Sequence, residues 1–243
     1  MSDYSINQVL TSLRAQFQQL ADPARAEAQR RYFKEPIQTY SLSVPHVRSI
    51  AKAFLPQLKR DASLDDALAL CERLLQTDGL EEGLAVETLM EPFLKQLAPQ
   101  HWPALDRWAD YLSNWAVTDG VSAHVIGSLI ERHPELAERL VAWTESQSRW
   151  RRRAACVSLV IPVRRNVVGP EAVCAVTNHL MGDRDDMVQK GAGWLLRDLS
   201  ITHRDEVVEY LKKYPSAGRT LVRYALEKMP EEVRRLFIAR PAK

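Results

Sequence analysis

The chain has 243 residues, of which 46% are hydrophobic and 26% charged, and its formal net charge is +2. This is an ordinary globular composition, and no apolar run approaches membrane length. Cys71, Cys156 and Cys174 are too few and scattered for a disulfide framework, and the six histidines lack ligand spacing. We therefore expect a cytoplasmic protein with reduced thiols, without signal peptide, metal or cofactor.

Nearly every segment has the apolar periodicity of a helix, and none has the alternation of a strand. A first helix opens the chain, a second covers residues 24–33, residues 35–44 form a loop, and Pro45 begins a third helix. Helix pairs follow at residues 63–75 and 80–97, 101–112 and 115–132, 134–144 and 148–163, 170–181 and 186–199, and 204–213 and 216–228, before a terminal helix from Pro230.

The second helices of these pairs resemble one another and recur at a spacing of roughly 35 residues, which is typical of stacked helical repeats. We predict an all-α fold, an α-solenoid of antiparallel helix pairs (HEAT-like repeats) with a concave basic face. It forms one domain over residues 1–243, with capping helices at 1–60 and repeats at 61–243. The alternative is a non-repeating helical bundle, which has no reason to repeat.

Three consecutive second helices carry unusual side chains near their starts. In each helix these side chains are spaced to share one face, and the solenoid would place them in a row. The set comprises a carboxylate, indoles and fixed cations: Trp115 and Asp119 on the first helix, Arg149, Arg152 and Arg153 on the second, and Lys190, Trp194 and Arg197 on the third.

Such a surface suits a nucleic acid. Cations bind phosphates, and an indole offers a face to a sugar or a base. A carboxylate among cations becomes useful when the bound sugar gains positive charge, as it does when an N-glycosidic bond breaks. Taken singly, each residue also has a structural explanation: the tryptophans as core, Asp119 as a solvated acid and the arginines as a solvated helix face.

The motif V-Q-K-G-A-G-W-L-L-R at residues 188–197 strongly resembles the Q-K-x-x-G-W-x-L-R motif of the AlkD-like DNA glycosylases. The segment R-R-A-A at residues 152–155 resembles their arginine-alanine-alanine helix start, and Trp115 and Asp119 match their W-x-x-x-D pair. Residues 31–34 (R-Y-F-K) and Val44-Pro45 are similar to the family's opening helices. The resemblance covers essentially the whole chain.

This resemblance implies a HEAT-like monofunctional glycosylase that excises N3- or N7-alkylated purines from double-stranded DNA. Asp119 would stabilise the oxocarbenium-like sugar and position water, Trp115 and Trp194 would contact the deoxyribose, and Arg153 would hold the backbone. We expect a monomer with DNA as its partner and no membrane. Further phosphate contacts are expected from Arg149, Arg152, Lys190 and Arg197.

The chain departs from the family pattern inside the W-x-x-x-D pair. Family members commonly have an acid after the tryptophan and an apolar residue before the catalytic acid, where this chain has Ala116 and Thr118. We expect this difference to bear on the orientation of Asp119 and on the lesions accepted. Two alternatives remain: a non-catalytic DNA-binding module that recognises distorted backbone, and a peptide-binding helical scaffold.

Overall fold

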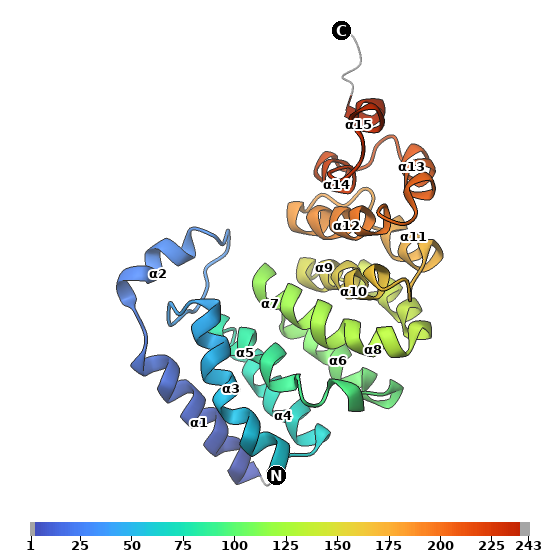
Figure 1. The fold of residues 1–243 in the computed structure, drawn as a ribbon. Coiled ribbons are helices and arrows are strands. Elements are labelled where there is room, and N and C mark those ends of the chain that lie inside the picture. Colours follow the sequence, from blue (N-terminus) through green and yellow to red (C-terminus); the bar gives the residue numbers. More distant parts are fainter. Residues whose placement is uncertain (1–2, 239–243) are drawn as a thin grey trace. The chain divides into compact units, whose positions relative to one another are not determined.

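The computed structural model describes residues 3–238, and the chain divides into two compact units, Met1–Val121 and Ser122–Lys243. Secondary structure in the described part is helical, apart from an isolated bridge between Gln38 and Gly79, so the all-α prediction is confirmed. Within each unit the helices follow one another as packed pairs, in the manner of a HEAT-like α-solenoid (Figure 1). No helix among these residues is long and apolar enough to cross a bilayer.

In the first unit, α5 occupies the centre and packs against α3, α4 and α7. Phe17 of α1, Leu58 of α3 and Leu70 of α4 are fully buried in this unit. The helices of this unit are α1 (Asp3–Gln19), α2 (Pro23–Arg30), α3 (Val44–Asp61), α4 (Leu64–Leu75), α5 (Leu80–Met90), η1 (Leu94–Gln96), η2 (Pro99–His101), α6 (Trp102–Trp108), η3 (Ala109–Tyr111) and α7 (Trp115–Gly120).

In the second unit the central helix is α12, which packs against α9, α10, α11, α13 and α14. Its inner side is closely packed, with Leu195 and Leu196 fully buried. The helices that follow α7 are η4 (Val121–Ile126), α8 (Gly127–Arg132), η5 (Pro134–Glu145), α9 (Arg149–Val157), α10 (Val160–Arg164), α11 (Pro170–Asn178), α12 (Asp186–Leu199), α13 (Arg204–Lys212), α14 (Arg219–Ala225) and α15 (Glu231–Ile238).

Several predicted helices are shorter or divided in the structure. The predicted helix at residues 80–97 ends at Met90, because Pro92 has no N–H for the carbonyl of Thr88. The prediction of one continuous helix over residues 148–163 is also wrong. α9 and α10 are separate helices, and Pro162 likewise has no N–H for the carbonyl of Ser158. Residues 134–144 form a 3₁₀ helix, and the helix predicted for 24–33 ends at Arg30.

The predicted helix at residues 115–132 forms, but as three successive segments. α7 is followed by the π-helical η4 and then by α8. The boundary between the two units lies within this run, after Val121. The prediction of one repeat domain with capping helices up to residue 60 stays a prediction.

Candidate active site and nucleic-acid interface

Helix α7 begins with a buried N-terminal cap. The side chain of Asn114 accepts a hydrogen bond from the backbone N–H of Val117 at 3.0 Å, and its carbonyl accepts one from the Thr118 hydroxyl at 2.7 Å. All three residues are buried, whereas Trp115 and Asp119 are partly exposed. Because residues four apart share one helical face, the capped helix places Trp115 and Asp119 on the same face.

The structure explains one of the two positions at which the chain differs from the family pattern, Thr118. It is fully buried, and its hydroxyl donates back to the carbonyl one helical turn earlier. Thr118 is therefore a packing residue of α7 with no unsatisfied polar group. Ala116 is partly exposed, so this substitution alters the surface beside the tryptophan.

Trp115 is held by the loop that follows α2. Its ring stacks on Phe33, with centroids 5.6 Å apart and planes inclined by 21°, and its Nε1–H donates to the carbonyl of Tyr32 at 3.3 Å. One side of the indole is thus covered and its polar edge is satisfied, while the side chain stays partly exposed. Trp115 is a supported aromatic surface, not a core residue.

The loop itself is fixed by a buried carboxylate. Glu81 is fully buried at the start of α5 and accepts hydrogen bonds from the backbone N–H groups of Tyr40 and Leu42, both at 3.0 Å, and from the Thr39 hydroxyl at 2.7 Å. A buried charge needs such partners, and three donors satisfy it. Glu81 therefore anchors the segment that brings the stacking partner of Trp115 into place.

A second carboxylate lies against α7 close to Asp119. This carboxylate is Glu87 of α5: a Cβ atom added at Gly120 would be 3.5 Å from its Oε2. The same Oε2 lies 3.5 Å from Nη2 of Arg48 on α3. Sequence reasoning missed Glu87 and Arg48. No local signal could have found them, because only the packing of α3, α5 and α7 places them beside the candidate catalytic acid.

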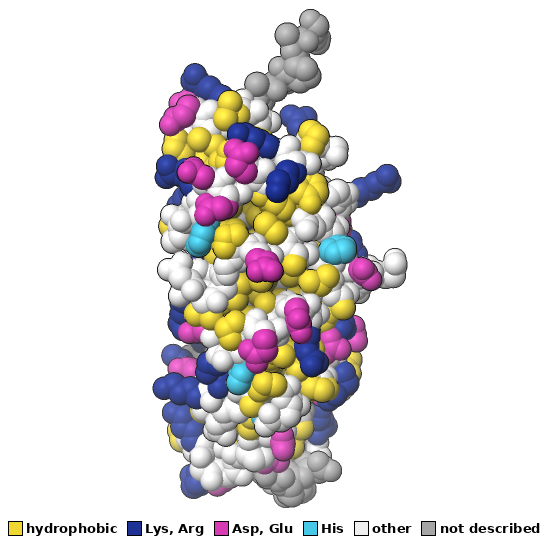
Figure 2. Space-filling view, turned by 90° about the vertical axis from the view of Figure 1, so that its right-hand side faces the viewer, with side chains coloured by type: hydrophobic (Ala, Val, Ile, Leu, Met, Phe, Trp, Pro, Cys, Tyr) yellow, Lys and Arg dark blue, Asp and Glu magenta, His cyan; other side chains and the backbone are white. Residues whose placement is uncertain are grey.

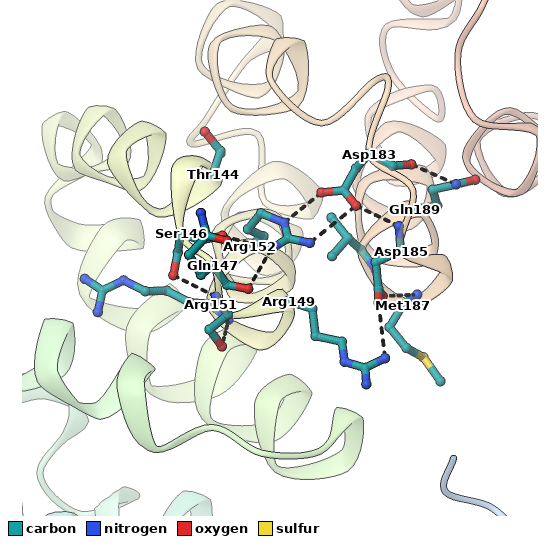
Figure 3. A network of polar contacts seen from close by, with 12 residues as sticks. Thr144, Ser146, Gln147, Arg149, Arg151, Arg152, Asp183, Asp185, Met187 and Gln189 are labelled. Atoms are coloured by element: carbon teal, nitrogen blue, oxygen red, sulfur yellow. Dashed lines mark hydrogen bonds and ion pairs between the residues drawn. The ribbon is translucent and has the colours of Figure 1, made fainter. Parts of the chain in front are cut away.

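In the second unit, the arginines at the start of α9 pair with the loop before α12 (Figure 3). Arg152 Nε lies 2.7 Å from Asp183, and its Nη1 donates to the carbonyl of Ser146 at 2.8 Å. Arg149 pairs with Asp185 at 3.1 Å. Two of the predicted phosphate ligands are therefore already neutralised within the protein.

Arg153 is buried, with 6% of its surface exposed. Its Nη1 donates to the carbonyl of Met187 at 2.6 Å, in the first turn of α12. A Cβ atom at Gly191 would lie 3.1 Å from Cγ of Arg153, so a glycine there leaves room for the arginine stem. These contacts make Arg153 a link between α9 and α12, and its contact with DNA stays a prediction.

Lys190, Trp194 and Arg197 form the partly exposed edge of α12. Lys190 pairs with Asp186 at 2.8 Å and Arg197 with Glu227 at 2.6 Å. Burial acts to lower the pKa of Arg197, but the hydrogen bond to Glu227 and neighbouring negative charge outweigh it and raise the pKa. The same bond lowers the pKa of the Glu227 carboxyl, so this pair stays charged over a wide pH range.

Two further groups in this unit were not singled out from the sequence. Asp198 accepts a hydrogen bond from Nε1 of Trp194 at 3.0 Å, and the signal that could have found it is the W-x-x-x-D spacing of this pair. Arg219 and Arg223 are exposed on α14, and within the described part of the chain neither makes an ion pair or hydrogen bond. Arg219 and Arg223 are thus exposed cations that lie one repeat beyond the predicted ones.

One face of the molecule exposes charges of both signs. On the face drawn in Figure 2, acidic and basic side chains are interspersed among hydrophobic ones, so no field of one sign covers it.

Among residues 3–238, no group of three or more His, Cys, Asp or Glu side chains could hold a metal ion.

Fold and side chains together define an all-α helical-repeat protein with a partly exposed Trp–Asp pair and an arginine-rich, ion-paired helix start. A family model described as DNA alkylation repair enzyme matches residues 13–229, and the chain belongs to that family, whose partner is DNA. A search of curated proteins finds no significant match.

A solved structure has the same fold. It is the predicted DNA alkylation repair enzyme from Enterococcus faecalis, which is 16% identical and superimposes with a TM-score of 0.76 over 86% of this chain and 97% of its own. At this identity the likeness concerns the fold alone.

Proposed function

We propose that this protein is a monofunctional DNA glycosylase that hydrolyses the N-glycosidic bond of N3- or N7-alkylated purines in duplex DNA. The observation that carries the proposal is the face of α7, where a carboxylate and a supported indole lie one helical turn apart. This pair suits a nucleoside, because the indole can contact the deoxyribose while the carboxylate faces positive charge developing on it.

In the proposed reaction the bond between C1′ and the purine nitrogen breaks, and its electron pair goes to the base. Alkylation has already made the purine cationic, so it leaves as a neutral molecule and needs no proton from the protein. The deoxyribose gains oxocarbenium character, which the Asp119 carboxylate stabilises. Water then adds to C1′, oriented by Asp119, and gives up its proton to that carboxylate.

In the second unit we propose that Trp194 contacts deoxyribose and that Arg153 contributes to the backbone contact. The other cations would exchange their carboxylate partners for phosphate oxygens, most readily in the partly exposed pairs, which hold their partners only weakly, and least readily at Arg152, whose pair with Asp183 is only 18% and 10% exposed. These cations are Arg149, Arg152, Lys190 and Arg197.

The test is single-turnover base release from duplex DNA containing N7-methylguanine. Wild type should release the base, and Asp119→Asn should lower the rate on the order of a hundred-fold or more, because it removes the charge that faces the transition state. DNA affinity should be retained. Asp65→Asn is a matched control, since Asp65 is an exposed aspartate on α4 of the same unit.

Equal inactivity of wild type and Asp119→Asn on N7-methylguanine and on bulkier N3 or N7 adducts would contradict the proposal. Retained, salt-sensitive duplex binding would then favour a non-catalytic module that recognises distorted backbone. Binding of an acidic peptide without competition from duplex DNA would favour a peptide scaffold.

A further inference from the structure

The W-x-x-x-D spacing begins at Trp102, Trp115 and Trp194 in this chain, and the pairs in α7 and α12 differ in what the indole binds. In α12, Nε1–H of Trp194 donates to Oδ2 of Asp198 at 3.0 Å. In α7, Nε1–H of Trp115 donates to the carbonyl of Tyr32 at 3.3 Å. Trp194 and Asp198 are therefore joined by a hydrogen bond within one helical face of α12, whereas Trp115 and Asp119 are not joined by their indole N–H.

Asp198 is a buried acid with three donors. Only 4% of its surface is exposed. Besides the indole, Arg164 Nε lies 2.7 Å from Oδ2, and Arg197 Nε lies 3.3 Å from Oδ1. A carboxylate this deeply buried and this fully paired cannot reach a substrate, so its effect must pass through the groups that it holds.

Arg164 holds the face of the same indole. It ends α10, its side chain is 48% exposed, and its guanidinium carbon lies 5.9 Å from the centroid of the Trp194 ring. This is within cation–π range. Trp194 is thus fixed at its edge by Asp198 and at one face by Arg164, while part of the side chain remains exposed.

We propose that Asp198 and Arg164 are positioning residues that hold the Trp194 indole in a single orientation for contact with deoxyribose. The inference rests on the proposed glycosylase function. The ring torsion of a tryptophan is broad and roughly two-fold on its own, so an unsupported indole would sample several orientations. A hydrogen bond at the edge and a cation at the face remove that freedom before DNA binds.

The first experiment observes the indole directly in the protein without DNA. The Trp194 Nε1–H resonance is assigned in a ¹H–¹⁵N spectrum by its disappearance in Trp194→Phe. In wild type it should exchange slowly with solvent, and Asp198→Ala should shift it and accelerate the exchange. Asp198→Asn keeps an acceptor oxygen and should restore slow exchange. Equal exchange in wild type and Asp198→Ala overturns the proposal.

The second experiment is a double-mutant cycle on single-turnover base release. Asp198→Ala should slow the reaction by roughly ten-fold or more, because small displacements of positioning groups are costly. In a Trp194→Phe background the same substitution should have no further effect. An equal loss with and without the indole overturns the proposal.

Arg164→Met tests the second contact, should Asp198→Ala fail to fold, and leaves Asp198 with two of its three donors, Trp194 and Arg197. It should slow base release several-fold, again only when Trp194 is present. Arg165→Met is the matched control: the neighbouring arginine pairs with Glu131 and should leave the rate unchanged. Equal effects of the two substitutions overturn the role of Arg164. If wild type releases no base, the proposed function fails, while the exchange measurement still decides the positioning of Trp194.

Discussion

Arg153 is the residue in which a functional and a structural role are hardest to separate. It is buried, and its guanidinium donates at 2.6 Å to the carbonyl of Met187. A basic residue in an arginine-rich helix start suggests phosphate binding from the sequence alone. Its burial adds a role in joining α9 to α12, so a loss of activity on its substitution could arise from either role.

Arg153→Ala should lower the free energy of unfolding by about 3 kcal/mol, because it opens a cavity and leaves the partners of a buried charge unsatisfied. Arg149→Ala should cost less than about 1 kcal/mol, because its partner Asp185 is held at a partly exposed site. Denaturant unfolding of both variants measures the difference. Similar values for the two would mean that Arg153 is not a structural link.

Asp119 and Asp198 show that identical spacing does not define a role. Both follow a tryptophan by four residues, yet Asp119 is partly exposed and Asp198 is 4% exposed. Only the exposed carboxylate can face a substrate. The distinction depends on Arg164, which lies 34 positions before Asp198 in the chain, and no local pattern contains that information.

At the scale of elements, the glycine-rich motif of α12 is explained by its neighbours. Gln189 Oε1 accepts from the backbone N–H of Thr220 at 3.2 Å and so supplies a cap that Gly218 cannot give to α14. A Cβ atom at Gly193 would lie 2.6 Å from the carbonyl oxygen of Leu221. The motif therefore holds α14 closely against α12.

Gly193→Ala should destabilise the protein by about 2 kcal/mol or more, because the added methyl meets the backbone of α14 and forces the helices apart. Gly182→Ala is the matched control, since a Cβ atom there would meet nothing within 4 Å. Thermal unfolding of the two variants tests this. An unchanged melting temperature for Gly193→Ala would show that α14 can move away from α12 without a loss of stability.

The helices themselves were predictable, because apolar periodicity and proline positions are local signals. The pairing of helices followed from the repeat spacing. The helix ends at Met90 and Val157 were missed, although Pro92 and Pro162 follow them closely. The support of Trp115 by Phe33 could not be predicted, because it depends on a loop held by a distant buried glutamate.

At the scale of the whole molecule, the net charge of +2 does not show which basic side chains are already paired within the protein. Among the cations predicted to bind phosphate, Arg149, Arg152, Lys190 and Arg197 already have carboxylate partners. If these cations bind phosphate as predicted, the pairs must break first, and we expect fewer counterions to be released than the count of basic residues suggests.

The buried thiols give the whole fold a predictable response to alkaline pH. Burial raises the pKa of Cys156 to about 12 and raises the pKa of Cys71 further, so both thiols stay protonated in the folded protein. In the unfolded chain they ionise above about pH 8.5. The unfolded state then binds fewer protons than the folded state, and the free energy of unfolding falls as pH rises.

Between pH values of about 8.5 and about 10, each buried thiol should remove about 2 kcal/mol of stability, from 1.4 kcal/mol per pH unit. Cys71→Ala and Cys156→Ala should each be less stable at neutral pH, yet lose less stability on the change to alkaline pH. Urea unfolding at the two pH values measures this difference in slope. Cys174, which is half-buried, serves as the control, because its pKa is raised less and Cys174→Ala should alter the slope least. Equal slopes in wild type and all three variants would mean that the buried thiols ionise without unfolding, which the packing around Cys71 and Cys156 opposes.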